Sequence, residues 1–377
     1  MDEQIEALRV IALEPYYGGS HLAFLDGLQA HSQHDWTILG LPAHKWKWRM
    51  RHSAIHFAQK CTQLMNKGEN WDVLVCSEML NLAEFKGLVG PVIASLPTVI
   101  YFHENQFDYP ARHHDERDLH LAMINFTSAL AADEVWFNSE YHRANLLNSC
   151  REMLQKMPDY QPMKQLDQIA RKSIVQHPSV EALPARPARV DGPPVLAWVA
   201  RWEHDKNPEL FFEALYQLIE EGLNFRLAVL GEQFRETPEI FATARTRLGD
   251  RVIQWGYLEN RKDYINRLLA SDIVVSTADH EFFGLAVVEA MVAGCYPLLP
   301  KRLVYPELLE PVRNPDCFLY DGTLAGLTEQ LRQLIQKVVE GQDIYQSAAD
   351  ARVAASRFLW SEQVLAVDER LSAIVNR

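Results

Sequence analysis

The sequence has few cysteines, no long hydrophobic run and no excess of positive charge. Its five cysteines are an odd number, are widely scattered and form no C-x-x-C pair, so we expect neither a disulfide framework nor a zinc or redox motif. No apolar run reaches the roughly 18 residues of a membrane-spanning helix, and Met1–Gln4 lacks the basic start of a secretion signal. A formal net charge of −13 argues against broad binding of nucleic acid or anionic membrane. We therefore expect a cytoplasmic protein without stable membrane association.

Length and hydrophobic patterning indicate two α/β domains. A chain of 377 residues is long enough for two separate cores. Short apolar segments alternate with longer helical patterns in both halves, which is typical of parallel sheets covered by helices on both faces. The predicted strands are 8–13, 73–76, 98–102 and 135–137 in the first half, and 195–200, 226–230, 252–255 and 273–276 in the second. We predict two doubly wound, Rossmann-like sheets with an interdomain cleft at the carboxyl ends of the strands.

A proline-rich segment separates the two halves. Residues 183–194 hold four prolines and a glycine, and proline lacks the N–H group that helices and central strands need. We expect an N-terminal domain at 1–183, a linker at 184–194, a C-terminal domain at 195–355 and a final helix at 356–377. Whether this helix returns to the N-terminal domain is left open by the sequence.

Two strand-to-helix junctions carry groups suited to a phosphate. Gly18 and Gly19 follow the first strand; paired glycines there let the backbone approach a phosphate, although glycines are common in any tight turn. Arg201 and Lys206 follow the strand that opens the second domain, and Asn207 is a natural helix cap that keeps both cations in the loop. They suit a diphosphate clamp. The alternative is two solvated surface charges.

Two glutamates lie near the predicted strand 273–276. Glu281 ends the loop after that strand, and Glu289 lies inside the following apolar helix. A buried carboxylate needs a partner. The two hydroxyls of a ribose would supply one, and a buried salt bridge or the positive end of the helix is the structural alternative.

These residues resemble the donor site of a known enzyme family. The 201–206 loop and the two glutamates, with seven residues between them, are similar to the signature of the family 4 retaining glycosyltransferases of GT-B fold. The resemblance implies that the C-terminal domain binds a nucleotide sugar, that Glu281 contacts the sugar and that Glu289 binds ribose. The backbone implied to hold sugar hydroxyls and phosphate is that of Phe283, Gly284 and Leu285.

The same resemblance implies an electrostatic reaction. The leaving phosphate takes the acceptor proton on the face from which it departs, while Arg201 and Lys206 neutralise the diphosphate and Glu281 lies beside the sugar. His103 ends another apolar strand and matches the family's N-domain histidine, so we expect it to touch the sugar or orient the acceptor; a structural histidine is the alternative. No D-x-D pair is present to hold a metal against a diphosphate. We expect no metal and no cofactor besides the sugar donor.

One segment of this acidic chain is strongly basic. Between residues 44 and 52, cations alternate with two tryptophans, which suits a polyanion whose bases stack on aromatic rings. Two alternatives remain open: an amphipathic element that buries the tryptophans and solvates its charges, or attachment to anionic lipid. The side chains concerned are Lys45, Trp46, Lys47, Trp48, Arg49 and Arg51.

The first domain also resembles a narrower group. Tyr17–His21, Leu41–Ala43, Phe102–Gln106 and Phe137–Ser139 are similar to the tRNA-queuosine α-mannosyltransferases. The resemblance implies GDP-mannose as donor and queuosine in the tRNA anticodon loop as acceptor. The N-terminal domain then binds the acceptor, with the basic segment and Asn105 contacting the RNA.

Two other functions remain open. The chain could be a family 4 hexosyltransferase of lipid-linked or capsular glycan synthesis, in which case the basic segment would meet lipid phosphates. It could also be a catalytically silent RNA-binding protein on a GT-B scaffold. The retained Arg201, Lys206, Glu281 and Glu289 speak against the silent protein.

Overall fold

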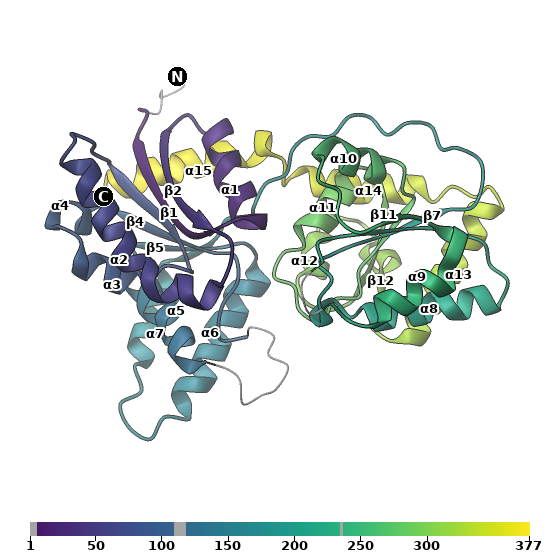
Figure 1. Cartoon of the computed structure of the whole chain (residues 1–377), viewed down its shortest axis with the longest axis horizontal. Coiled ribbons are helices and arrows are strands. Elements are labelled where there is room, and N and C mark those ends of the chain that lie inside the picture. The colour runs from purple at the N-terminus through teal and green to yellow at the C-terminus, as the bar shows by residue number, and fades with distance from the viewer. Residues whose placement is uncertain (1–5, 109–117, 234–236) are drawn as a thin grey trace. The chain divides into compact units, whose positions relative to one another are not determined.

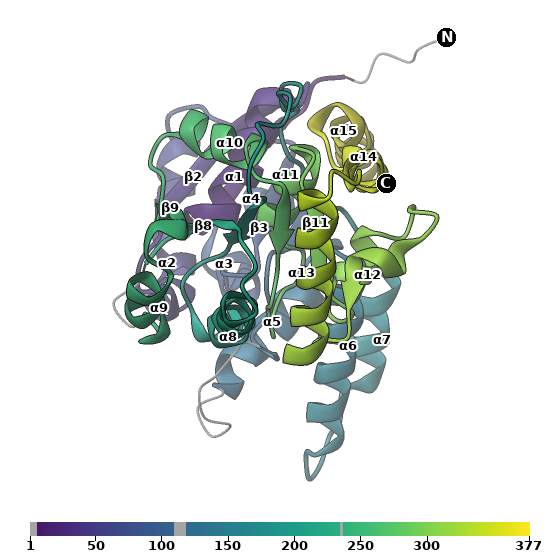
Figure 2. The same ribbon diagram turned by 90° about the vertical axis from the view of Figure 1, so that its right-hand side faces the viewer.

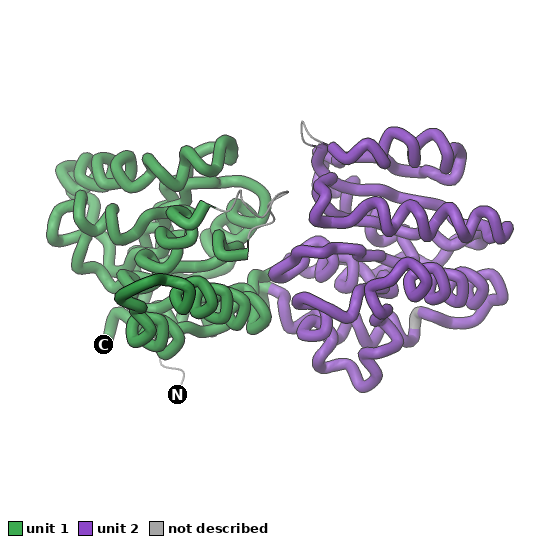
Figure 3. The backbone as a smooth tube through the Cα atoms, turned by 90° about the horizontal axis from the view of Figure 1, so that it is seen from below, with its two compact units in different colours: residues 1–179, 360–377 green, residues 180–359 purple. Residues whose placement is uncertain are grey.

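The structure is a computed structural model that describes residues 6–108, 118–233 and 237–377, and the chain divides into two compact units. Figure 3 shows unit 1, residues 1–179 with 360–377, in green and unit 2, residues 180–359, in purple. In the described part of the chain, no helix combines the length and the apolar character that crossing a membrane requires.

Unit 1 is built on a parallel sheet with the strand order β2-β1-β3-β4-β5-β6. The strands are β1 (Arg9–Tyr17), β2 (Asp35–Pro42), β3 (Val73–Ser77), β4 (Thr98–Phe102), β5 (Glu134–Phe137) and β6 (Ser173–Val175). The helices are α1 (Gly19–His31), α2 (Trp46–Met65), α3 (Leu82–Leu88), α4 (Pro91–Ala94), α5 (Leu119–Ala131), α6 (Glu140–Gln155), α7 (Met163–Arg171) and α15 (Trp360–Val375). The order reverses between β1 and β3, which is the place where doubly wound sheets bind ligands.

Alternate residues of β1 point to opposite faces of this sheet. Ile11 and Leu13 pack with apolar residues of α2, α3, α5, α6 and α7, whereas Val10 and Ala12 pack with those of α1 and α15. Both sets are fully buried. The sheet is therefore covered on both faces, which explains why its central strands are continuous apolar runs.

The C-terminal helix α15 covers part of unit 1, and Figure 1 shows it in yellow beside α1. A Cβ atom on Gly27 of α1 would come within 1.9 Å of the Trp360 indole, so only glycine permits this close approach. The indole also stacks on His31, with ring centroids 5.3 Å apart. Ser32 Oγ donates a hydrogen bond of 2.6 Å to Asp368. The end of the chain thus completes one face of the first sheet.

Unit 2 repeats this design with the strand order β12-β11-β10-β7-β8-β9, again parallel. The strands are β7 (Val195–Val199), β8 (Arg226–Leu230), β9 (Val252–Trp255), β10 (Ile273–Val275), β11 (Tyr296–Pro300) and β12 (Leu319–Tyr320). The helices are α8 (Pro208–Glu220), α9 (Ile240–Leu248), α10 (Arg261–Leu269), α11 (Leu285–Val292), α12 (Tyr305–Leu308), α13 (Leu324–Val339) and α14 (Tyr345–Ser356), with short 3-10 turns η2 (His204–Lys206), η3 (Gly249–Arg251) and η4 (Pro315–Phe318). Helices α8 and α13 pack side by side (Figure 2). Here the order reverses between β7 and β10.

The segments that border the two units both belong to unit 2. The proline-rich segment forms neither helix nor strand, and Arg186 within it donates a hydrogen bond of 3.0 Å to the buried Asp272. Residues 356–359, which the sequence assigned to the final helix, are held differently. Arg357 donates to the Glu307 carbonyl at 2.7 Å, and the Phe358 ring meets the edge of Phe283 with centroids 5.2 Å apart. These contacts end α14 before α15 begins.

Candidate active site

Two loops meet at the switch point of the sheet in unit 2, one after β7 and one after β10. The Asp279 N–H donates to the Asp205 carbonyl at 2.8 Å, and Thr277 Oγ1 donates to the Lys206 carbonyl at 2.8 Å. Asn207, which caps α8 as the sequence predicts, donates from Nδ2 to Asp279 Oδ2 at 2.9 Å. These bonds fix the backbone of both loops before any ligand binds.

Lys206 is buried between these loops, with only 7% of its surface exposed. Its Nζ donates to the His280 carbonyl at 2.6 Å and lies 3.3 Å from Glu281 Oε2 and 3.1 Å from Asp205 Oδ2. Burial lowers the pKa of Lys206, but the Glu281 and Asp205 carboxylates outweigh it and raise that pKa. Burial likewise raises the pKa of Glu281, and Lys206 outweighs it, so the Glu281 pKa is lowered. Both partners therefore stay charged at neutral pH.

Arg201 lies in the same loop but is arranged differently from Lys206. Its side chain is half exposed, and Nη2 lies 3.2 Å from Glu203 Oε2. The structure therefore brings Lys206 and Glu281 together and leaves the Arg201 guanidinium at the surface of the loop. An exposed guanidinium can reach an incoming phosphate, whereas buried Lys206 acts from a fixed position.

The backbone after Glu281 is partly engaged by Glu281 itself. Its Oε1 accepts the N–H groups of Phe282 at 3.2 Å and Phe283 at 3.4 Å. The Phe283 amide, expected to hold the sugar or the phosphate, thus donates to a side chain of its own loop. Gly284, in a left-handed conformation with φ of 81°, caps α11, and Leu285 is its first residue. The first amides of a helix have no intrahelical acceptor, so Gly284 and Leu285 suit an anion.

Glu289 already has protein partners in this structure. Its side chain is 12% exposed and forms an ion pair with Arg261, and the Tyr264 hydroxyl donates to Glu289 Oε2 at 2.8 Å. Its carboxylate is thus satisfied without a ribose, as the structural alternative described. Arg261 and Tyr264 were not singled out in the sequence. Their spacing of three positions on α10 places both on one helix face, but their pairing with α11 is a tertiary contact.

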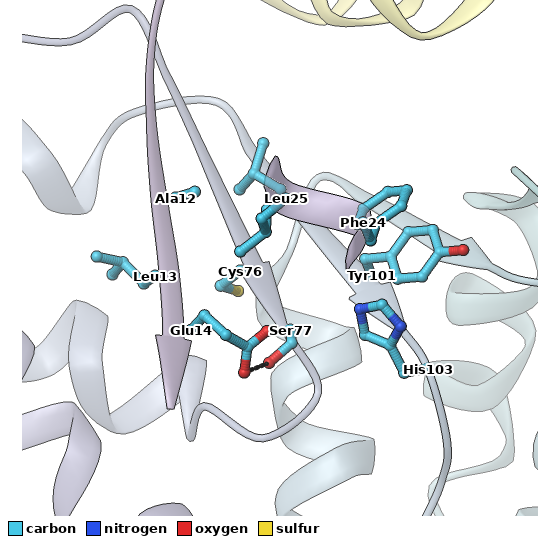
Figure 4. Close-up of a pocket in the computed structure, with 10 residues that line it drawn as sticks. Ala12, Leu13, Glu14, Phe24, Leu25, Cys76, Ser77, Tyr101 and His103 are labelled. Carbon is cyan, nitrogen blue, oxygen red and sulfur yellow. Dashed lines mark hydrogen bonds between the residues drawn. The ribbon is translucent and has the colours of Figure 1, made fainter. Parts of the chain in front are cut away.

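Unit 1 gathers carboxylates and imidazoles at its own switch point. Glu14, near the end of β1, is buried, and its Oε1 accepts hydrogen bonds from the Tyr16 N–H at 2.8 Å and from Ser77 Oγ at 2.9 Å (Figure 4). Glu14 Oε2 lies 3.0 Å from His21 Nδ1. Glu78, after β3, is fully buried and lies with Oε1 3.9 Å from His21 Nε2.

His103 follows β4 and stacks against His21, with ring centroids 3.9 Å apart. Its backbone N–H donates to Glu78 Oε2 at 3.1 Å. Burial lowers the pKa of His21, but Glu14, Glu78 and Glu104 outweigh it and raise that pKa to about 9. Burial, followed by His21 and His142, holds the pKa of His103 well below its usual range. Near neutral pH a cationic His21 therefore supports a neutral His103.

Glu14, His21 and His103 also form a group that could hold a metal ion. Their ligand atoms lie within 4.8 Å of one another. Imidazole and carboxylate are common metal ligands, but Glu14 and His21 are hydrogen-bonded to each other here. Burial raises the pKa of the neighbouring Glu78 to about 8, which makes it a poor anionic ligand at neutral pH. Absence of a metal stays a prediction.

The basic segment becomes the start of helix α2, so its residues point in different directions. Trp46 is half-buried and packs on a small cluster that includes Met50, and Lys47 Nζ lies 5.5 Å from the Trp46 ring centre. Trp48 is 62% exposed. Arg51 pairs with Asp118 at 3.6 Å. The alternation in the sequence does not produce one face, because a helix turns by about 100° per residue.

Three other residues that were predicted to contact a ligand have structural roles in unit 1. Asn105 is fully buried; it donates to Asn145 Oδ1 at 3.1 Å and accepts the Phe107 N–H at 3.0 Å, so its amide holds the loop together. A Cβ on Gly18 would lie 2.4 Å from the Ala43 Cβ, and Gly19 has φ of 54°. Close packing and a left-handed turn therefore explain the glycines without a phosphate.

Several site residues were given no role by the sequence analysis of their own segments. Glu14, His21 and Glu78 come from three separate segments, and each looks like an ordinary polar residue in its own segment. Two hints were available: the acidic Glu14 directly follows the predicted strand 8–13, and His21 belongs to the Tyr17–His21 segment of the family resemblance. Asp205 was likewise overlooked beside Lys206.

Comparison with known proteins agrees with the division into two units. Residues 9–180 match the family described as tRNA-queuosine alpha-mannosyltransferase N-terminal, and residues 179–351 match glycosyl transferases group 1. The chain is 41% identical over 334 residues to the tRNA-queuosine alpha-mannosyltransferase of Drosophila melanogaster, and this likeness covers 85% of each chain.

Solved structures share the fold at low sequence identity. Sucrose-phosphate synthase from Thermosynechococcus elongatus superposes with a TM-score of 0.72 at 14% identity, over 98% of this chain and 99% of that one. Anabaena HepE in complex with UDP does so with a TM-score of 0.65 at 16% identity, over 97% of this chain and 100% of that one. The chain therefore has the GT-B fold and belongs to the tRNA-queuosine alpha-mannosyltransferase family.

Proposed function

We propose that this protein transfers mannose from GDP-mannose to queuosine in the anticodon loop of tRNA, with retention of configuration. One observation carries the proposal: the 41% identity to the Drosophila enzyme extends over 334 residues, which is longer than either unit and so includes both. The UDP complex of the structurally similar HepE supports a nucleotide-sugar donor.

The donor half of the reaction is assigned to unit 2. Lys206 is a buried cation at a switch point, and Arg201 is a second cation in the same loop. Together they neutralise the diphosphate as the sugar–phosphate bond breaks. Glu281, held by Lys206 and by two backbone amides, lies beside the sugar as positive charge develops there. Glu289 is assigned to accept hydrogen bonds from the ribose hydroxyls, in place of its present ion pair with Arg261.

The acceptor half is assigned to unit 1. Neutral His103 presents a ring nitrogen that can accept a hydrogen bond, and it orients the acceptor hydroxyl. The proton of that hydroxyl goes to the leaving diphosphate as the new glycosidic bond forms. RNA contacts are assigned to the exposed side chains of the basic segment, and Asn105 is excluded from them because it is buried.

The proposal requires no metal, because Lys206 and Arg201 are assigned to neutralise the diphosphate. It also places the protein in the cytoplasm, where tRNA is used. Removal of divalent metals is tested below.

The decisive assay uses total tRNA, the purified full chain and a panel of GDP-mannose and UDP-sugars, followed by mass analysis of the nucleosides. We expect queuosine to gain one hexose with GDP-mannose alone. Transfer only from UDP-sugars would overturn the donor. A hexose on lipid but not on tRNA would indicate the glycan-synthesis enzyme, and tRNA binding without any turnover of sugar nucleotides would indicate the silent RNA-binding protein.

A further inference from the structure

Helix α2 has a long exposed face without a single acidic residue. Its 20 residues contain no Asp or Glu, although the whole chain contains 50. Because a helix turns by about 100° per residue, positions spaced by three or four share a face. Such spacing joins five residues, called here the α2 basic face: Lys45, Arg49, His52, His56 and Lys60.

The partners of the α2 basic face are not carboxylates of the described residues. In the described part of the chain, none of the five forms a salt bridge with a carboxylate. Arg49 instead donates to the Pro42 carbonyl at 3.2 Å and lies 3.2 Å from His52 Nε2. Burial, Arg49 and His56 all lower the pKa of His52. Lys45 and Arg49 are neighbouring like charges and repel each other, so stability of the fold does not explain this pair.

The position of these cations on the helix is also unfavourable by itself. Lys45 and Arg49 lie at the N-terminal end of α2, where the helix dipole favours negative charge. Arg51, which points away from the α2 basic face, is the cation that has an acidic partner, Asp118. An anionic ligand along the face would offset both the repulsion between like charges and their unfavourable interaction with the helix dipole.

An exposed aromatic ring at the edge of the face favours RNA over lipid as that ligand. Trp48 is 62% exposed, and its ring lies 5.0 Å from the His52 ring. The only other exposed large apolar residue of α2 is Ile55, at 48%. A helix that lies in a membrane buries a broad apolar face, which these two residues do not provide. Phosphates beside a stacking platform are what single-stranded RNA presents.

We propose that the α2 basic face, with Trp48 at its edge, is the surface along which the backbone of the RNA acceptor lies. At about 1.5 Å per residue, Lys45 to Lys60 spans roughly 22 Å, enough for several consecutive phosphates. The inference rests on the proposed function for the identity of the RNA. It replaces Trp46, Lys47 and Arg51 of the sequence prediction by His52, which ends the basic segment, and by His56 and Lys60, which lie beyond it.

Equilibrium binding of the full chain to a fluorescent tRNA tests this surface without catalysis. Exposed Gln59 lies between His56 and Lys60 on the same side of α2, and Gln336 is exposed on α13. We expect Gln59→Glu to weaken binding about 5- to 10-fold because it adds an anion beside the RNA, and Gln336→Glu to change it less than twofold. The double variant His56→Ala/Lys60→Ala should weaken binding about 10-fold and flatten the salt dependence by roughly one phosphate contact, while Lys337→Ala should not.

The results of these binding measurements test the surface separately from the proposed reaction. Wild-type affinity in Gln59→Glu and in the double variant would overturn the surface, even if mannose transfer proceeds normally. Weakened binding in both, combined with no sugar transfer to any tRNA, would retain the surface and refute the proposed reaction. Binding of phosphatidylserine vesicles, but not of tRNA, through the same side chains would assign the face to lipid and overturn the proposal. Circular dichroism checks that each variant folds.

Discussion

The two units use the same sheet design for opposite chemical environments. At the switch point of unit 2, one buried lysine is shared by two carboxylates, and its loops are joined by a dense set of hydrogen bonds. At the switch point of unit 1, the buried Glu14 and Glu78 surround one imidazolium, which in turn stacks on a neutral imidazole. Unit 2 holds a fixed lysine cation between two carboxylates, and unit 1 presents a neutral hydrogen-bonding ring.

The two units also differ in how specific their family matches are. Unit 2 matches glycosyl transferases group 1 in general, and unit 1 matches the N-terminal half of one named group. Donor chemistry is common to many enzymes, so its site is generic. Recognition of one acceptor needs particular side chains, which we assign to unit 1. Variants in the two units can therefore separate donor chemistry from acceptor recognition.

Loss of the buried cation should have the largest effect. Lys206→Ala and the better-filling Lys206→Met should each lower kcat by about 10²- to 10³-fold, because one preorganised charge on the departing diphosphate is removed. Steady-state kinetics measures this. The Kd for tRNA should not change, since the contacts assigned to RNA belong to unit 1. A folded Lys206→Met protein with unchanged kcat would contradict the role of Lys206.

The two tryptophans of the basic segment should behave differently. Trp48→Ala removes an exposed stacking platform, worth about 1–3 kcal/mol per base, and should weaken tRNA binding about 5- to 100-fold with little change in the midpoint of urea unfolding. Trp46→Ala removes half-buried packing against Met50 and should lower that midpoint instead. Equal losses of affinity in both variants would contradict the separation of faces.

The charged state of His21 predicts how stability varies with pH. Because its pKa is raised from 6.5 to about 9, its contribution is full below about pH 6.5 and is lost as pH rises through about 9. Hydrogen exchange of the amides in β1 and α1, measured along a urea series, should report the free energy of unfolding of unit 1. We expect this free energy to fall over the pH range by on the order of a few kcal/mol. In His21→Gln the difference from wild type should shrink as pH rises. A constant difference would indicate that His21 is not charged.

Chelation of metals should have the smallest effect. Mannose transfer in excess EDTA should proceed at the untreated rate, because Lys206 and Arg201 supply the positive charge. Loss of activity that zinc or magnesium restores would assign a metal to the Glu14, His21 and His103 group or to the donor.

Most of the fold could be predicted because the central strands are buried on both faces and therefore read as apolar runs. Of the edge strands, β9 was predicted, but β2 and β6 are only partly buried and β12 has two residues, so these three were missed. β11 was missed because it directly follows α11 in the apolar stretch 285–300, where Gly294 alone marks the turn. The packing of α15 depends on the Trp360 fit over Gly27, which no local pattern reveals.

The candidate site was predictable only where a motif lies in one stretch of chain. Glu281 and Glu289 are close in sequence, and Lys206 follows a clear strand. Glu14 and Glu78 come from the ends of β1 and β3, and His21 lies on helix α1, so their arrangement depends on two strands and a helix meeting at one edge. The partners of Glu289 come from a different helix.

The most direct test of the account uses one tRNA prepared with and without queuosine. After incubation with GDP-mannose and the purified chain, nucleoside mass analysis should show one added hexose on queuosine, and no hexose on the tRNA that lacks it. Equal labelling of both tRNAs, or labelling of neither by an active, folded protein, would contradict the central claim.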